Sequence, residues 1–410
     1  MNQRRLYRTI ESFASKHFKT DRELLKHVVN EIVKNEDIAI KGGRIWLYDP
    51  STESYRLIHQ IGMMQRLEPG YVIPVARYPI FLRLAEHRSV LAKETDKVLQ
   101  KKGILKFFAT GVGEKIPFKK GFLYPYVLAF NSDATDEALL PELNIISLAV
   151  SSLLRGRNIE QKARLLEKDL DKAREIQQSI LPTPYLRFHH FEIYGNSRAE
   201  QIVGGDFFDY LLPDGEKDRL SIVVGDAASK GLQAAAQAMY VVGALRMGTL
   251  FHTKISILMS RINSIINKTF AEEQFVSMFY CELSDDQKGL VLYSNAGHNS
   301  PILYHAHERS IEVLEPTGQI LGPFPDAKFR VENTTLKPGD VMLMYSDGIS
   351  EARDINDRGY GEKRLEEKLE EVHRLSAREI CEAVFDDVMK FSIGSGVSDD
   401  KTLVVVKRVH

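Results

Sequence analysis

The chain contains few cysteines. Its 410 residues include only Cys281 and Cys381, and neither has a second cysteine or a histidine nearby at the spacing of a metal site. This scarcity argues against a zinc site and against a disulfide framework. We therefore expect two reduced thiols, as is usual in a cytosolic protein.

Long apolar runs and an excess of charge of one sign are also lacking. No stretch reaches 18 uninterrupted apolar residues, and the N-terminal segment carries charges where a signal peptide has its apolar core. Lys plus Arg number 55 and Asp plus Glu number 56. This balance gives no electrostatic case for nucleic acid or an anionic membrane as the main partner. We expect a soluble, cytoplasmic protein.

Three common sequence motifs of enzymes are absent. The sequence has no GxxxxGK[ST] phosphate loop, and it has neither a GxSxG nor a cysteine-nucleophile motif.

Hydrophobic residues make up 43% of the chain, which is enough for ordinary globular cores. The length predicts two domains rather than one.

Residues 143–184 are predicted to form a helical linker between two globular blocks. The stretch from 143 to 181 has no proline and favours helix, which Pro182 and Pro184 then end. An apolar seam with one polar member is spaced 4-3-4-3-4-3 and consists of Ile159, Ala163, Leu166, Leu170, Ala173, Gln177 and Ile180. Such a seam predicts a coiled coil that makes a homodimer. The alternative is a single amphipathic helix packed on its own domain.

Residues 1–142 mix helix and strand. An apolar stripe at helical spacing begins at Leu24 and Leu25, and GGRIWLYDPSTESYRLIHQIG predicts a hairpin with its turn near 49–51. KKGILKFFATG and KKGFLYPYVLAFN each predict a later strand. The strand–turn–strand pattern, the KGFLYPYVLAFN strand and the exit into a helix resemble a GAF sensor domain. That resemblance implies a module that senses a small molecule or a protein partner.

Residues 185–410 are rich in strands. FEIYGNS, RLSIVVGD, FVSMFYCELS, GLVLYSNAGH, PILYHA, SIEVLE, FRVENTTL, DVMLMYSDG and TLVVVKRV are all predicted to be strands. Helices are predicted at 231–250, at 255–270 and, as a pair, over 362–392. Runs of strands with helices in separate blocks indicate an α+β sandwich rather than βαβ units.

Acidic residues recur at the ends of apolar strands. Asp206 lies in VGGDFFDY, Asp226 in VVGDAASKG, Asp347 in MYSDGISEA, and Asp399 with Asp400 in SDDKTLVVVKR. A buried carboxylate without a partner is costly, and these loops hold no matching set of basic residues. A cation is the simplest common partner, and an oxygen-only ligand set favours Mg²⁺ or Mn²⁺. Ordinary turns and helix caps are the alternative for each acid.

Seven motifs occur in a fixed order from the linker onwards: AREIQQSILP, VGGDFFDY, VVGDAASKG, AGHNSP, PTGQILG, LKPGDVMLMYSDGISEA and SDDKTLVVVKR. Together they resemble the metal-dependent PPM (PP2C-type) serine/threonine phosphatases of the RsbU/SpoIIE branch. The resemblance implies a PP2C-like antiparallel β-sandwich flanked by helices, with two Mn²⁺ or Mg²⁺ ions held between the sheets.

The resemblance also implies roles for particular residues. Asp226 would bridge two metals, the backbone carbonyl of Ala227 would join it, and Asp347 and Asp399 would complete the catalytic cluster. Asp206 would contribute directly or through water.

For six further residues the sequence leaves the role or the local conformation open, or favours a structural role. Asp209 and Asp400 are open, and Lys230 either approaches a phosphate or is solvated. His298 is expected to be a structural loop residue, and Arg198 a surface arginine. Ser229 stands where the family usually has glycine, which puts the conformation of that loop in question.

For function, the resemblance implies a phosphoserine or phosphothreonine phosphatase with water as the nucleophile. Its substrate would be a STAS-type anti-sigma-factor antagonist in a bacterial partner-switching pathway, under the control of the N-terminal sensor domain. A regulator of the same fold that binds a phosphoprotein without turning it over is the alternative.

Overall fold

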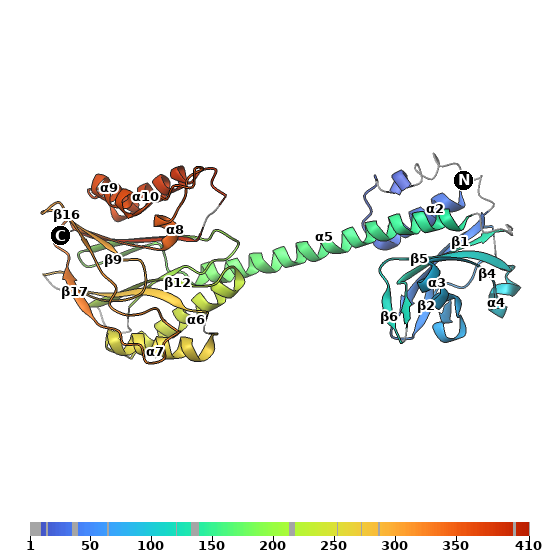
Figure 1. Ribbon diagram of the computed structural model, residues 1–410, viewed down its shortest axis with the longest axis horizontal. Coiled ribbons are helices and arrows are strands. Elements are labelled where there is room, and N and C mark those ends of the chain that lie inside the picture. The colour runs from blue at the N-terminus through green and yellow to red at the C-terminus, as the bar shows by residue number, and fades with distance from the viewer. Residues whose placement is uncertain are drawn as a thin grey trace. The chain divides into compact units, whose positions relative to one another are not determined.

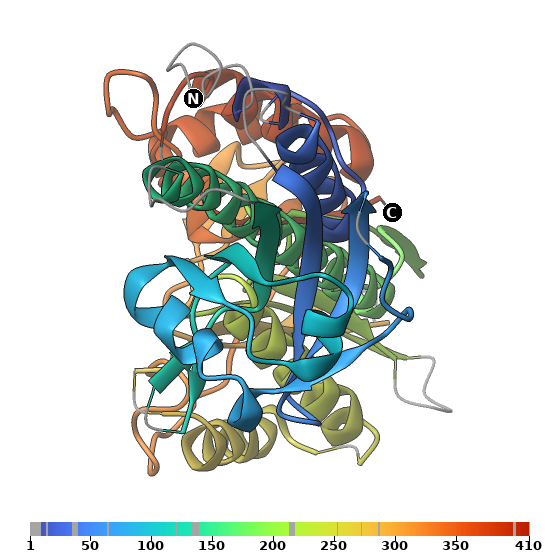
Figure 2. The same cartoon turned by 90° about the vertical axis from the view of Figure 1, so that its right-hand side faces the viewer.

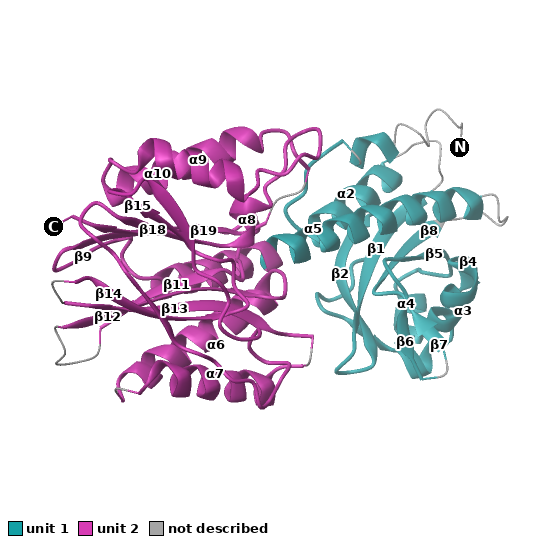
Figure 3. Ribbon diagram, turned by 60° about the vertical axis from the view of Figure 1, so that its left-hand side comes forward, with its two compact units in different colours: residues 1–165 teal, residues 166–410 magenta. Residues whose placement is uncertain are grey.

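The computed structural model describes residues 10–13, 15–34, 40–63, 65–119, 121–132, 139–212, 218–251, 253–271, 273–285, 288–396 and 399–409. The chain divides into two compact units, residues 1–165 and residues 166–410 (Figure 3). The division falls inside the long helix α5 (Leu140–Ile180), which Figure 1 shows in green. Across the described part of the chain, no helix is long and apolar enough to cross a membrane.

Unit 1 is built on a six-stranded antiparallel sheet in the order β3-β2-β1-β8-β5-β4. The strands are β1 (Ile40–Asp49), β2 (Ser54–Gly62), β3 (Val72–Pro74), β4 (Ser89–Lys93), β5 (Lys106–Val112) and β8 (Tyr126–Ser132). The predicted hairpin is confirmed as β1–β2, and the Asp49 side chain accepts a hydrogen bond from Ser51 N at 3.0 Å in its turn.

The single strand predicted over KKGFLYPYVLAFN is wrong. The structure has two strands here, β7 (Gly121–Leu123) and β8, with Pro125 between them. β7 pairs with β6 (Ile116–Phe118), whereas β8 joins the main sheet. Proline has no N–H to donate to a ladder and fixes its own φ, so a strand with proline inside is interrupted there.

Helices cover one face of this sheet. α2 (Asp21–Val33) and the first part of α5 share a core with β1, β5 and β8, and Figure 2 shows both helices beside the strands. The predicted apolar stripe of α2 is the face it buries, with Leu24, Leu25 and Val28 at most 1% exposed. The Thr20 side chain caps the helix by accepting a hydrogen bond from Glu23 N.

The opposite face of the sheet carries a second core. Short elements surround it: η1 (Val75–Arg77), α3 (Ile80–His87) and α4 (Lys97–Lys101). Side chains alternate between the two faces of each strand, so Ile45 packs under the helices and Trp46 on this opposite side.

Unit 2 is a sandwich of two antiparallel sheets, as predicted. One has the order β16-β15-β18-β19-β10-β9, and the other β11-β12-β13-β14-β17. Their bounds are β9 (Tyr185–Phe188), β10 (Phe191–Arg198), β11 (Phe207–Leu211), β12 (Arg219–Ala227), β13 (Val276–Ser284), β14 (Leu290–Ala296), β15 (Ile302–His305), β16 (Ser310–Val313), β17 (Glu332–Thr335), β18 (Val341–Tyr345) and β19 (Lys401–Arg408).

Helices flank both outer faces of the sandwich. α6 (Leu232–Thr249) and α7 (Ile255–Thr269) pack on the five-stranded sheet. α8 (Asp347–Ser350), α9 (Glu362–Val372) and α10 (Ala377–Phe391) lie against the six-stranded sheet. The central strands are therefore buried on both faces. In β19, for example, Val404 faces the other sheet and Val405 faces the helices, which explains its unbroken apolar run.

The predicted seam of α5 divides into two parts. Ile159 and Leu166 are each 62% exposed within the chain. Towards the end of the helix, the seam residues Gln177 and Ile180 contact the sandwich: Gln177 hydrogen-bonds Gly204, and Ile180 packs against the core under α6. The predicted dimer through this seam stays a prediction.

Candidate metal centre

The acids predicted at strand ends lie at one edge of the sandwich. Asp226 is the penultimate residue of β12, and Asp206 comes directly before β11, its neighbour in the five-stranded sheet. On the six-stranded sheet, Asp347 begins α8 just after β18, and Asp399 comes just before β19, which pairs with β18. Each sheet thus supplies two of the acids.

A hydrogen bond connects the two halves of this cluster. The Ser346 hydroxyl donates to Asp206 Oδ2 at 2.6 Å, and accepts from Thr402 N at 3.0 Å. Ser346 is fully buried and is the N-cap residue of α8. It therefore fixes the Asp206 carboxylate of one sheet against β18 and β19 of the other. Ser346 was not among the predicted site residues: serine is a common N-cap residue, but this hydroxyl makes no capping hydrogen bond and contacts Asp206 instead.

Asp400, whose role the sequence left open, anchors a loop. Its carboxylate accepts hydrogen bonds from Glu200 N at 2.8 Å and from Gly205 N at 2.6 Å. A Cβ atom on Gly204 would lie 2.2 Å from Asp400 Oδ2, so only glycine fits this approach. Asp400 therefore holds the Gly204–Gly205 loop that leads into Asp206.

The second glycine of that loop lies against the backbone at the end of β12. A Cβ on Gly205 would come within 2.8 Å of the Ala227 carbonyl oxygen and 3.2 Å of Asp226 Oδ1. The Ala227 carbonyl itself accepts a hydrogen bond from Ser229 N at 2.6 Å. Ser229 does not have a positive φ. The serine therefore fits this loop without backbone strain.

Burial and mutual repulsion raise the pKa values of three of the acids. Burial, followed by the charges of Asp347, Asp399 and Asp400, raises the pKa of Asp226 to about 7. Burial and the charge of Asp226 raise the pKa of Asp206 well above its usual range. The pKa of Asp347 is also raised, first by burial and then by Asp399. These mutual effects mean that the carboxylates lie close enough to repel one another.

The donors in this cluster fit hard divalent cations. They are carboxylate oxygens and one backbone carbonyl, which suit Mg²⁺ or Mn²⁺. Raised carboxyl pKa values are what repulsion produces where no cation offsets it. Within the described ranges, however, no three Asp, Glu, His or Cys side chains already converge as ligands of one ion. The acids are gathered at one edge of the sandwich but do not form a preformed ligand set.

Other residues considered from the sequence lie around the cluster or away from it. Asp209 is buried and pairs with Arg246 at 2.6 Å, so it joins β11 to α6 instead of facing the acids. The Lys230 ammonium is 73% exposed and lies 3.8 Å from Asp399 Oδ2. Arg198 is exposed and stacks over the Phe385 ring at 5.2 Å.

His298 is buried in a polar loop. Its Nδ1 lies 2.8 Å from the Ser277 hydroxyl, and its backbone N–H donates to Asn295 Oδ1 at 2.9 Å. Burial lowers the pKa of His298 to about 4, so the ring is neutral at pH 7. The expected structural role is consistent with these contacts.

A cavity of ≈ 270 Å³ adjoins the cluster at Asp206 and Asp400. Arg174 and Gln177 of α5 line it together with Arg198 of β10. Gln177 Nε2 donates to the Gly204 carbonyl at 2.6 Å, and its Oε1 accepts from Gly204 N at 3.2 Å. The end of the linker helix is thereby tied to the loop that carries Asp206.

Comparisons with known proteins agree with this architecture. A family model described as "Stage II sporulation protein E (SpoIIE)" matches residues 216–409. The chain is 27% identical over 255 residues to "Phosphoserine phosphatase RsbU" of Bacillus subtilis, a match that covers 62% of this chain and 72% of that protein. It is 28% identical over 269 residues to "Protein IcfG" of Synechocystis sp., covering 58% of this chain and 41% of that protein.

A solved structure shows the same fold. The "SiaA-PP2C domain of Pseudomonas aeruginosa" superposes with a TM-score of 0.52 at 19% identity, covering 60% of this chain and 98% of that domain. The two-sheet sandwich with helices on both outer faces is therefore the PP2C fold.

Proposed function

Residues 216–409 form a SpoIIE-type phosphatase domain of the PP2C class, and from this premise we propose that the chain removes phosphate from serine or threonine of another protein. The observation that carries the proposal is the gathering of Asp206, Asp226, Asp347 and Asp399 at one edge between two sheets. Rigid strands hold these acids, as phosphoryl transfer requires positioned charges.

The residues that would hold the cations are those at the strand ends. Two divalent ions, Mn²⁺ or Mg²⁺, would be held by the carboxylates of Asp206, Asp226, Asp347 and Asp399 and by the backbone carbonyl of Ala227. Two such ions supply an acidified water molecule and offset the charge of the phosphoryl group. Ser346 and Asp400 keep Asp206 and its loop in position through their hydrogen bonds.

The proposed reaction needs no covalent enzyme intermediate. A water oxygen forms the new bond to phosphorus while the bond from phosphorus to the serine or threonine oxygen breaks. The leaving oxygen takes up a proton, and inorganic phosphate is released. Among the residues that the structure describes, Cys281 and Cys381 are both buried, so neither thiol is available as a nucleophile.

The substrate we propose is a phosphorylated STAS-type anti-sigma-factor antagonist in a bacterial partner-switching pathway. The support is the similarity to the phosphoserine phosphatase RsbU. Unit 1 would act as the sensor domain that controls the phosphatase, and the exposed seam residues Ile159 and Leu166 support a homodimer through α5.

Phosphate release from a phosphoserine form of such an antagonist tests the proposal. The full chain should release phosphate with Mn²⁺ present, and this release should stop when EDTA removes the metal. Asp218→Asn, at an exposed site beside the opposite end of β12 from Asp226, serves as the control and should keep the wild-type rate. Tight binding of the phosphoprotein without any phosphate release, at any Mn²⁺ concentration, would instead establish the non-catalytic regulator.

A further inference from the structure

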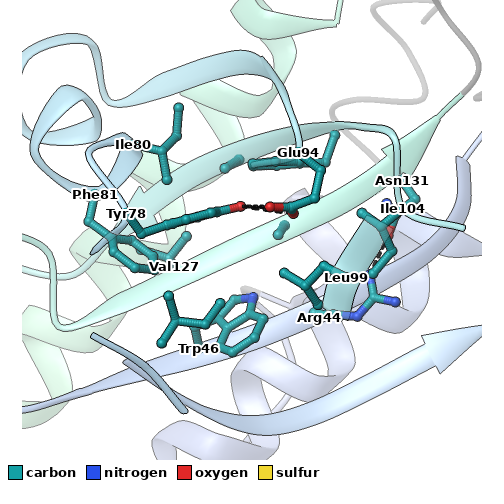
Figure 4. A pocket seen from close by; sticks show the side chains of 14 residues that line it. Arg44, Trp46, Tyr78, Ile80, Phe81, Glu94, Leu99, Ile104, Val127 and Asn131 are labelled. Atoms are coloured by element: carbon teal, nitrogen blue, oxygen red, sulfur yellow. Dashed lines mark hydrogen bonds between the residues drawn. The ribbon is translucent and has the colours of Figure 1, made fainter. Parts of the chain in front are cut away.

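Unit 1 contains a small cavity on the face of its sheet opposite α2 and α5 (Figure 4). Its floor consists of alternate residues of two paired strands, Arg44 and Trp46 of β1 with Val127, Ala129 and Asn131 of β8. Residues outside the two strands complete the wall: Ile73, Tyr78, Ile80, Phe81, Glu94, Leu99, Ile104, Phe107 and Ala109. Most of this lining is apolar.

A buried cation lies at one side of the cavity. Arg44 is only 5% exposed, and one of its terminal nitrogens donates to the amide oxygen of Asn131. Its Nε has no hydrogen-bond partner among the residues described. A neutral amide does not offset the charge of a buried guanidinium, and an unpaired buried donor is costly. The site therefore lacks an anionic acceptor next to Arg44 Nε.

A buried anion lines the same cavity. Glu94 is also 5% exposed, and Tyr78 donates its hydroxyl to both carboxylate oxygens at 2.8 Å. Thr95 N and Asp96 N donate to Oε1 only, at 2.8 Å each, which leaves Oε2 with spare acceptor capacity. Figure 4 shows the hydrogen bonds of Glu94 and Arg44 going to different partners. No ion pair joins these two charges within the described ranges.

Two opposite charges across an apolar cavity match a ligand that carries both charges itself. We propose that this cavity binds a small zwitterion with an apolar body, of the class of apolar α-amino acids. The ligand carboxylate accepts from Arg44 Nε, the ligand ammonium donates to Glu94 Oε2, and the apolar side chain packs against Trp46 and Phe81. Each buried charge then meets its opposite.

The cavity must widen to admit this ligand. Its present volume is ≈ 20 Å³, which is room for one or two water molecules. Leu99 and Ile104 cover it from α4, a helix of 5 residues, and the turn after it. Val98 and Leu105 on the same segment are 45% and 68% exposed. An outward shift of this thin cover enlarges the cavity without disturbing the sheet.

The binding proposal stands apart from the phosphatase proposal, because it is tested by binding to the full chain with no turnover. Calorimetry with L-valine, L-leucine and L-phenylalanine should show saturable binding of at least one. L-Leucine, for example, is then compared with 4-methylpentanoate, which lacks the ammonium, and with 3-methylbutylamine, which lacks the carboxylate. For an amino acid that binds, we expect each of its two analogues to bind at least about tenfold more weakly than the amino acid itself.

Two outcomes on the wild-type chain would overturn the proposal. One is the absence of binding by every amino acid of the panel at millimolar concentration. The other is an analogue that binds as tightly as its parent amino acid, because then one of the two charges plays no part.

Variants assign the two ends of the ligand. Arg44→Gln should weaken binding of the amino acid on the order of 100-fold. Glu94→Gln should abolish the preference for the amino acid over its deaminated analogue. Loss of folding would not give this result, because it would abolish the binding of both compounds. Arg56→Gln is the matched control, an exposed arginine that pairs with Asp49 outside the cavity. Affinity that falls equally in Arg56→Gln and Arg44→Gln would reject the assignment.

Discussion

Gln177 of α5 and Gly204 exchange two hydrogen bonds: Gln177 Nε2 donates to the glycine carbonyl, and Gln177 Oε1 accepts from the glycine N–H. Gly204 is followed by Gly205 and Asp206, so the amide reaches to within two residues of a predicted metal ligand. A polar residue in an otherwise apolar seam usually sets coiled-coil pairing. Here it contacts the phosphatase domain instead.

We predict that Gln177→Ala loosens the Asp206 loop and raises the Mn²⁺ concentration for half-maximal activity by about tenfold, since small misplacements of catalytic groups are costly. KM for the phosphoprotein should stay unchanged. Gln178→Ala, at the exposed neighbouring position, is the control. A metal titration with the same midpoint for both variants would show that the amide has no positioning role.

Asp226→Asn and Asp347→Asn should each lower turnover by about 100-fold or more, because each removes a proposed ligand of the cations. Both should raise the melting temperature of the metal-free protein, because like-charge repulsion among the acids is reduced. Both should also weaken Mn²⁺ binding measured by calorimetry. Near-normal turnover at saturating Mn²⁺ in either variant would remove the two-metal assignment.

Leu166→Lys should convert a dimer to a monomer in light scattering, because it places a charge in the seam. Leu165→Lys is a close control, since Leu165 is 63% exposed against 62% for Leu166 but lies outside the seam. The control should keep the mass of the wild type. If both lysine variants retain the wild-type mass, the seam is not the dimer contact.

A group of hydrogen bonds to Asp387 of α10 predicts that the stability of the fold depends on pH. Arg364 donates to both oxygens of Asp387 at 3.0 Å, and the Tyr360 hydroxyl donates at 2.7 Å. The Arg364 hydrogen bond in particular lowers the pKa of Asp387. A carboxyl group whose pKa is lower in the folded state stabilises the fold above its unfolded pKa, and this contribution is lost as pH falls through the folded value.

Asp387→Asn should therefore reduce the free energy of unfolding by about 1–3 kcal/mol at pH 7. The difference from wild type should shrink below pH 4. Asp386→Asn, at the exposed adjacent position, should change little at either pH. Denaturant unfolding at both pH values measures the effect, and a pH-independent difference would contradict the role of the charge.

The acids were predictable from the sequence because each follows or precedes an apolar strand, and strand ends fix a side chain's place. The partners of these acids were not. Asp209 and Asp206 are equivalent candidates in the VGGDFFDY motif. Asp209, however, pairs with Arg246, 37 residues further along the chain, and does not face the other acids. Ser346 reaches Asp206 across 140 residues. The first contact depends on how α6 packs on its sheet and the second on how the two sheets stack, and no local pattern encodes either.

The same limit holds in unit 1. The apolar stripe of α2 and the β1–β2 hairpin follow from local periodicity and turn residues. Arg44 and Glu94 are ordinary charged residues in the sequence. Their burial beside one cavity becomes visible only in the fold. There β1 pairs with β8, and the segment that carries Glu94 lies over the same face of the sheet.

Strand β19 lies between β18 and β10 in the middle of its sheet, yet Asp399 and Asp206 are nearly 200 positions apart in the sequence. At a synthesis rate of about 5–20 residues per second, roughly 10–40 s separate the appearance of these two acids at the ribosome. Until β19 emerges, the six-stranded sheet lacks a central strand and the proposed metal centre lacks Asp399. The proposed metal centre is therefore completed only at the end of synthesis, when the last strand joins its sheet.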